Sequence, residues 1–154
     1  MNQVFKWIFS AVLLFGISLV PNDLMAKSTQ TTMEKEAQEM HKVVFHLTSN
    51  VQEEHIAMLK HIENLSAGLK DKIIIEVVAH GPGISMFMKE NPLAKQAVEL
   101  QTNLPVRFSI CENTLKQKNI DKSALYPGLY FVPGGLVHVI KLQEQGYAYI
   151  KANF

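Results

Sequence analysis

A single cysteine, Cys111, occurs among the 154 residues, and no C-x-x-C pair is present. An internal disulfide and thioredoxin-type dithiol chemistry are therefore excluded. The sequence also lacks the G-x-S-x-G turn of serine hydrolases and the G-x-G-x-x-G fingerprint of dinucleotide-binding folds. No Lys-Ser or Lys-Thr pair follows its glycine-rich corners, so a phosphate-binding loop is not indicated either.

Charge and histidine spacing argue against two further classes of protein, those that bind nucleic acids and those that bind a metal ion. The formal net charge is +1 without a basic cluster, so the electrostatic footprint of a nucleic-acid-binding protein is missing. The six histidines form no H-x-x-x-H pair and no cluster with the cysteine. We therefore predict no metal site and no cofactor.

Residues 1–26 have the pattern of a secretory signal peptide. Lys6 gives a short positive region, residues 7–20 are an apolar run, and Pro21 breaks it before Ala26, the small residue expected at a cleavage site. The run is short for a bilayer-spanning helix of about 20 residues, although an uncleaved anchor is the alternative. We expect cleavage after Ala26 and a periplasmic or otherwise exported protein. An exported lone thiol either pairs between chains, stays reactive, or is buried and inert.

The remaining chain has the composition of one globular domain, with 47% hydrophobic and 19% charged residues in the whole sequence. Residues 27–40 are polar and predict a flexible lead-in, and residues 41–154 predict the folded domain. Alternating strand and helix patterns predict an α/β fold with a mostly parallel sheet covered by helices on both faces. The strands are expected at residues 41–48, 72–79, 105–111, 129–132 and 147–150. The first two are nearly continuous apolar runs, which indicates burial on both faces.

In such a sheet, functional groups collect at the carboxyl ends of the strands. Cys111 ends one strand, and Asn113 and Thr114 after it favour the start of a helix. A helix amino terminus stabilises a thiolate, which lowers a thiol pKa from about 8.5 into the range of ~3.5–7.5. His80, which ends another strand, is a candidate to assist the thiol. Two alternatives remain open: Cys111 as a small buried hydrophobe, and His80 as a residue that only packs the corner.

Three segments carry a resemblance to a known family. Val77-Val-Ala-His-Gly-Pro-Gly-Ile84, Cys111-Glu-Asn-Thr-Leu115 and Gln145-Gly-Tyr-Ala-Tyr-Ile150 resemble, in order and spacing, the DsrE/DsrF-like family over roughly residues 41–151. The resemblance implies a three-layer α/β/α sandwich around a mostly parallel, five-stranded sheet, and homotrimers or homohexamers. In sulfur-relay members a cysteine accepts sulfur as a persulfide and passes it to a partner, and Cys111 matches that position. The export signal and the absence of sister subunits depart from the relay pattern.

The leading hypothesis is a protein that carries sulfane sulfur as a persulfide on Cys111 and passes it to an acceptor thiol. Backbone N–H groups of Glu112, Asn113 and Thr114 would stabilise the anion, and His80 would assist. The glycine-rich corner with Gly81 and Gly83 would let the backbone approach a bound group closely. The predicted partners are a sulfur donor and an acceptor thiol, on a protein or a small molecule. The alternative is a non-catalytic oligomeric binding module in which Cys111 is buried and inert.

Overall fold

The computed structural model describes residues 40–70 and 72–152. The predicted signal peptide and, apart from residue 40, the predicted lead-in lie outside the described residues. Five strands form one sheet in the order β4-β3-β2-β1-β5, and every pairing is parallel. Their bounds are β1 His41–Leu47, β2 Ile73–Ala79, β3 Val106–Cys111, β4 Tyr130–Val132 and β5 Ala148–Lys151. The predicted parallel α/β sheet is confirmed.

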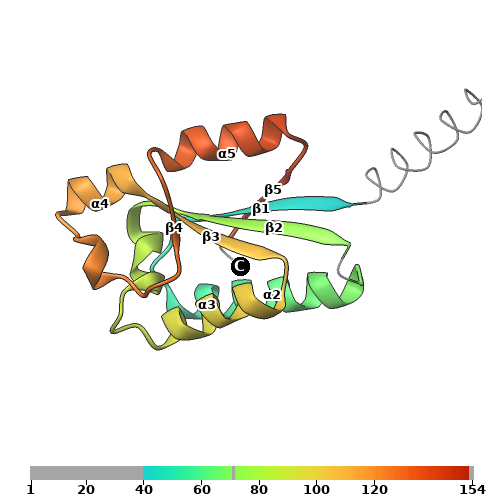
Figure 1. Ribbon diagram of the computed structural model, residues 1–154, viewed down its shortest axis with the longest axis horizontal. Coiled ribbons are helices and arrows are strands. Elements are labelled where there is room, and N and C mark those ends of the chain that lie inside the picture. Colours follow the sequence, from blue (N-terminus) through green and yellow to red (C-terminus); the bar gives the residue numbers. More distant parts are fainter. Residues whose placement is uncertain (1–39, 71, 153–154) are drawn as a thin grey trace, which may run out of the picture. The chain divides into compact units, whose positions relative to one another are not determined.

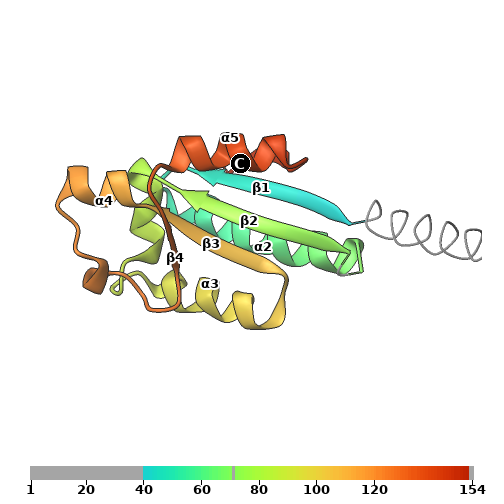
Figure 2. The same ribbon diagram turned by 45° about the horizontal axis from the view of Figure 1, so that its top comes forward.

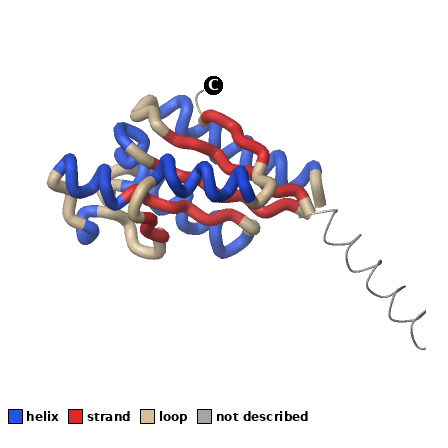
Figure 3. The backbone as a smooth tube through the Cα atoms, turned by 90° about the horizontal axis from the view of Figure 1, so that it is seen from above, coloured by secondary structure: helices blue, strands red, loops and turns tan. Residues whose placement is uncertain are grey.

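Helices cover the two faces of the sheet unequally. The helix α2 (Gln52–Gly68), the 3₁₀ segment η1 (Gly81–Phe87) and α3 (Pro92–Asn103) lie on one face, and α5 (Gly135–Glu144) lies alone on the other (Figures 1 and 2). Figure 3, seen from above, shows α5 in front of the sheet and running roughly along the strands. Right-handed crossovers explain this arrangement, because the chain adds β2 and β3 in one direction and returns to β5 in the other.

A third group of helices lies at the carboxyl edge of the sheet, in the segment of the chain that connects β3 to β4. It consists of α4 (Glu112–Lys118) and the short 3₁₀ segment η2 (Lys122–Ala124). The helix expected to start at Asn113 or Thr114 therefore begins at Glu112, directly after the cysteine. Among the described residues, no helix is both long and apolar enough to cross a membrane.

The residues that face α2 and α3 are apolar throughout. Side chains alternate along a strand, so every second residue points to the same face. On this face they belong to one buried hydrophobic cluster: Val43, Phe45, Leu47, Ile73, Ile75, Val77, Ala79, Val106, Phe108 and Ile110.

The face toward α5 is mixed, which corrects the expectation of strands that are apolar on both sides. Its buried apolar cluster is small, with Val44, Val78, Val139 and Leu142. Between these lie polar and titratable strand residues, namely His46, Glu76, Arg107, Ser109 and Cys111. Burial of the central strands on both faces is confirmed, but burial on this face is achieved largely by hydrogen-bonded polar groups.

The register brings the chemically interesting residues to one edge. Leu47 pairs with Ala79 across β1 and β2, and Ala79 pairs with Ile110 across β2 and β3. His80 and Cys111 follow directly after this row, at the carboxyl ends of adjacent strands. Both residues therefore lie on the same rim of the sheet.

Candidate functional site

Cys111 lies where two helices begin. It is the last residue of β3 and the N-cap residue of α4. Its Sγ also accepts a hydrogen bond of 3.2 Å from the backbone N–H of Gly135, the first residue of α5. The partial positive charges of both helix amino termini therefore act on one sulfur atom. Asn113 and Thr114 lie inside α4, not before it, so the cysteine itself makes the turn into the helix.

The hydrogen bonds around the sulfur favour the thiolate. Burial by itself raises the pKa of the Cys111 thiol, but hydrogen bonds from the Thr114 hydroxyl and from the N–H groups of Gly135, Thr114 and Asn113 outweigh it. The net result is a pKa below the ordinary value of a thiol. A larger share of Cys111 is therefore ionised at neutral pH than for an ordinary cysteine.

Thr114 connects the cysteine to the glycine-rich corner after β2. The N–H of Gly81 donates a 3.0 Å hydrogen bond to Oγ1 of Thr114. With its oxygen occupied as acceptor, the hydroxyl has its own hydrogen available for the sulfur. Gly81 adopts a left-handed conformation with φ of 56°, which explains why a glycine is used there.

His80 and Cys111 both pack against Gly135. A methyl group added to Gly135 would lie 3.1 Å from Cβ of His80 and 3.2 Å from Cβ of Cys111. Within residues 40–70 and 72–152, no hydrogen bond joins the imidazole to the sulfur. Burial lowers the pKa of His80, so at neutral pH it is uncharged and able to accept a proton.

The other predicted binding residues have structural partners. Gly83 lies against the backbone of β1, where any side chain would collide with the carbonyl oxygen of Leu47. Glu112 accepts a hydrogen bond from Nζ of Lys122, and the N–H of Asn113 donates to the carbonyl oxygen of Pro133. Their roles in binding a ligand stay predictions.

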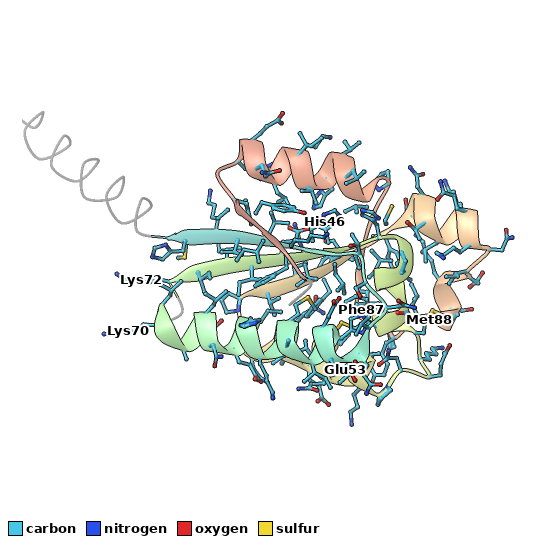
Figure 4. The ribbon with its side chains drawn as sticks, turned by 180° about the vertical axis from the view of Figure 1, so that it is seen from behind. His46, Glu53, Lys70, Lys72, Phe87 and Met88 are labelled. Carbon is cyan, nitrogen blue, oxygen red and sulfur yellow. The ribbon has the colours of Figure 1, made fainter. Side chains whose placement is uncertain are left out.

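Two groups of residues near the site were not predicted from the sequence. The first is His46 with Tyr149. Nδ1 of His46 lies 3.0 Å from the hydroxyl of Tyr149, and its ring lies 4.6 Å from the ring of His80, measured between centroids. In Figure 4, His46 lies between the sheet and α5. The alternation of Val44, His46 and Thr48 along one strand was the available signal, but pairing with Tyr149 depends on a neighbour distant in sequence.

The second group surrounds Glu76, whose side chain is 2% exposed in the middle of β2. One carboxylate oxygen accepts from Oγ of Ser109 at 2.6 Å and lies 2.5 Å from Nε2 of His138, while the other accepts from Arg107. Burial raises the pKa of Glu76, but hydrogen bonds from Arg107, Ser109 and His138 outweigh it and hold the pKa below its usual range. The carboxylate therefore stays ionised and connects α5, through His138, to the centre of the sheet.

Access to the sulfur is narrow, since Cys111 is only 5% exposed. A surface hollow of about 560 Å³ beside α4 is lined by Glu112, Leu115, Lys116 and neighbouring residues up to Lys122, but not by Cys111. In the described part of the chain, no group of three or more His, Cys, Asp or Glu residues is arranged to hold a metal ion.

Comparisons with known proteins agree with the fold. A sequence profile described as the DsrE/DsrF-like family matches residues 28–152. The solved structure of MTH1491, a protein of unknown function from Methanobacterium thermoautotrophicum, is similar with a TM-score of 0.68 and 31% sequence identity. The match covers 72% of this chain and 98% of that chain. No curated protein matches the chain.

Proposed function

Since the chain belongs to the DsrE/DsrF-like family, which is associated with sulfur relay in general, we propose that it carries sulfane sulfur as a persulfide on Cys111. The observation that supports this most directly is the hydrogen bonding of Sγ at the start of two helices, by Gly135 and Thr114. These donors stabilise the thiolate, which is the nucleophilic form of cysteine.

Loading would proceed by attack of the Cys111 thiolate on the sulfane sulfur of a donor. A new S–S bond forms, the S–S bond within the donor breaks, and its electron pair leaves on the donor sulfur. The proton lost by the Cys111 thiol is accepted by His80 and returned to the departing donor thiolate. No external oxidant or reductant is required, because the sulfur atom is exchanged between partners of the same oxidation level.

Unloading reverses the roles. The thiolate of an acceptor attacks the outer sulfur of the persulfide, and Cys111 leaves as a thiolate. The same N–H and O–H donors that favour the nucleophile also favour this leaving group, since a thiol of lower pKa leaves faster. A sulfur held this way can be passed in both directions, which suits a carrier better than an enzyme that uses one substrate.

The test is the intact mass of the protein after exposure to inorganic polysulfide. We expect a gain of one sulfur atom that is reversed by a reductant and is absent in Cys111→Ser. A thiol that gains no sulfur, or a gain that persists in Cys111→Ser, contradicts the proposal. Cys111→Ala serves as a second control, because it lacks the hydroxyl that Cys111→Ser introduces.

A second candidate is the non-catalytic binding module, which the low exposure of Cys111 favours. Burial to 5% exposure is the property of an inert cysteine. The rate of alkylation by iodoacetamide against pH separates the two readings. A thiol that reacts in the native protein at neutral pH supports the carrier, whereas one that reacts only after denaturation supports the binding module.

Assembly into homotrimers or homohexamers is part of the proposal. The outer side of α5 exposes three apolar side chains, Leu136, Val137 and Ile140, each more than half exposed. Covering such a patch is a reason for copies to associate. Analytical ultracentrifugation of Ile140→Asp, with Gln143→Asp as control, tests this: we expect only the first to shift the protein to the monomer.

Export is also a proposal. We propose that the mature protein begins after Ala26 and acts outside the cytoplasm, as the pattern of residues 1–26 indicates. The amino-terminal sequence of protein purified from its native compartment tests it. An intact Met1 would contradict cleavage.

A further inference from the structure

A row of four side chains runs across the carboxyl edge of the sheet, on the face toward α5. Tyr149 of β5, His46 of β1, His80 after β2 and Cys111 of β3 come from four strands that are adjacent in the sheet. Strand alternation places all four on the same face. The row begins at an exposed edge residue, since Tyr149 is 43% exposed, and ends at the buried sulfur.

The first three side chains of the row contact one another, and Gly135 lies between the third and the cysteine. The hydroxyl of Tyr149 lies 3.0 Å from Nδ1 of His46, and the two rings meet edge to face. The rings of His46 and His80 are 4.6 Å apart and tilted by 46°. His80 then shares with Cys111 the surface of Gly135. Movement of the Tyr149 or His46 side chain would therefore change the position of the imidazole at the sulfur.

The nitrogen atoms of this row are incompletely used. Nε2 of His46 and Nε2 of His80 are both buried, and neither has a hydrogen-bond partner among the described residues. His46 itself is 7% exposed. A buried polar atom without a partner costs free energy, and such costs are concentrated where chemistry requires the group. One of the two imidazoles lies against Gly135, whose N–H binds the sulfur, and the other packs on that imidazole.

From this arrangement we propose that Tyr149 and His46 are positioning residues that hold the imidazole of His80 beside Cys111 and keep the transferred proton on His80. The inference rests on the proposed sulfur-carrier function and adds two residues to it. During loading the proton moves from Sγ of Cys111 to His80, and then to the departing donor thiolate. His46 neither gains nor loses a proton in this sequence.

The surrounding charges explain why the proton stays on His80. Burial, the nearby His80 and the ammonium group of Lys151 lower the pKa of His46 to about 4. His46 is therefore neutral at neutral pH, where its hydrogen bond with Tyr149 is retained. Other titratable groups on this face include Lys42 of β1, Glu76 of β2, Arg107 and Cys111 of β3, and His138 of α5. Glu76 pairs with both Arg107 and His138.

The test measures the two halves of sulfur transfer separately. Loading of Cys111 by inorganic polysulfide and release of the outer sulfur to free cysteine are each followed by quenched-flow mass spectrometry between about pH 5 and 9. Tyr149→Phe removes only the hydroxyl. Because His80 accepts the proton during loading, we expect loading about fivefold slower from the loss of one hydrogen bond, a displaced acid limb in its pH profile, and unchanged release. His46→Gln should have the same effects with a larger reduction in rate.

The matched control is Tyr130→Phe, which removes a phenolic hydroxyl from the opposite edge strand on the same face. Tyr130 stacks with Arg107 and lies outside the row, so the loading rate of this variant should equal that of the wild type. A Tyr149→Phe variant with the wild-type rate and pH profile overturns the inference while leaving the carrier function intact. A wild-type protein that takes up no sulfur overturns both.

A second measurement does not require sulfur uptake. The ring C–H resonances of His80, followed by NMR against pH, report its protonation directly. We expect the titration of His80 to shift in Tyr149→Phe and in His46→Gln, and to be unchanged in Tyr130→Phe. Identical titration of His80 in all four proteins contradicts the positioning role even where the variants fold normally.

Discussion

The two faces of the sheet are built from the same five strands but differ in chemistry. Toward α2 and α3, the strand residues form a single apolar core with Phe45, Phe87 and Phe108 fully buried. Toward α5, the centre is an ionised carboxylate, Glu76, and the carboxyl edge carries two histidines and the cysteine. The first face stabilises the folded protein by excluding water from apolar side chains. The second stabilises it mainly through hydrogen bonds between buried polar groups.

This difference explains where the candidate site lies. Close packing of apolar side chains tolerates few changes in volume and leaves no group that can accept or donate a proton. A face covered by one helix keeps polar groups buried enough to have shifted pKa values, yet close enough to solvent for a substrate. The sulfur chemistry that we propose therefore belongs to the face with less covering, and stability depends mainly on the other.

The largest effect should come from the apolar face. Phe108→Ala removes a fully buried ring that lies 5.4 Å from the ring of Phe87. We expect a loss of about 3–5 kcal/mol in the free energy of unfolding, because a cavity remains. Urea unfolding measures it. Ser109→Ala, the next residue along β3 but on the other face, is the comparison. A larger loss for Ser109→Ala would reverse the assignment of the two faces.

On the polar face, Glu76→Gln should cost about 3 kcal/mol, since it removes the charge of a buried carboxylate that is hydrogen-bonded to Arg107, Ser109 and His138. The folded-state pKa of Glu76 is lowered, so the carboxylate contributes stability above the ordinary value near 4.5. That contribution is lost as the pH falls through the folded-state value. Unfolding at several pH values should show the wild type and the variant converging in acid. A constant difference would contradict this.

A smaller effect on stability is expected for Gly135→Ala. The added methyl group would crowd the Cβ atoms of His80 and Cys111, so we expect a loss of about 1–2 kcal/mol from overpacking. Displacement of the N–H from the sulfur should also slow alkylation of Cys111 at neutral pH. Gly134→Ala is the control, because its nearest neighbours would lie at 3.7 Å. Equal rates of Cys111 alkylation in the two variants would show that the N–H of Gly135 does not contribute to the reactivity of the thiol.

The smallest stability effect should be that of Thr114→Val, about 1 kcal/mol, because a single hydroxyl is lost. Its effect on chemistry should be clearer. Without the hydroxyl the pKa of Cys111 rises, so the pH dependence of iodoacetamide alkylation should move to higher pH. Thr114→Ser keeps the hydroxyl and should retain the wild-type profile. If Thr114→Val alkylates with the same pH dependence as the wild type, the backbone N–H groups alone lower the pKa of Cys111.

Local patterns predicted the elements well. Apolar runs such as Ile73-Ile-Ile are typical of strands. Asn91 before Pro92 is a typical helix start, and in α3 the Asn91 side chain accepts from the N–H of Leu93. These features depend on neighbours in sequence. Cys111 as a strand end near a helix was also visible, because both the apolar run and the helix-starting residues adjoin it.

The contacts that were missed join distant segments. Arg107 and His138 meet at Glu76 from β3 and α5, and no local pattern encodes that meeting. The pairing of His46 with Tyr149 likewise requires that β5 return beside β1. A carboxylate in a strand that is otherwise apolar, such as Glu76, was the one available sign that the second face differed. Its partners could be found only in three dimensions.

The position of β5 has a consequence for how the protein acquires its native structure. His46 and Tyr149 are separated by 103 residues along the chain. Contacts between such distant segments form slowly, because a long loop must close before they contribute. The β1–β3 portion can assemble from shorter connections, whereas α5 and β5 must cross back over it. A newly synthesised chain would thus have its cysteine uncovered until this final segment docks, and that interval is when unwanted oxidation is easiest.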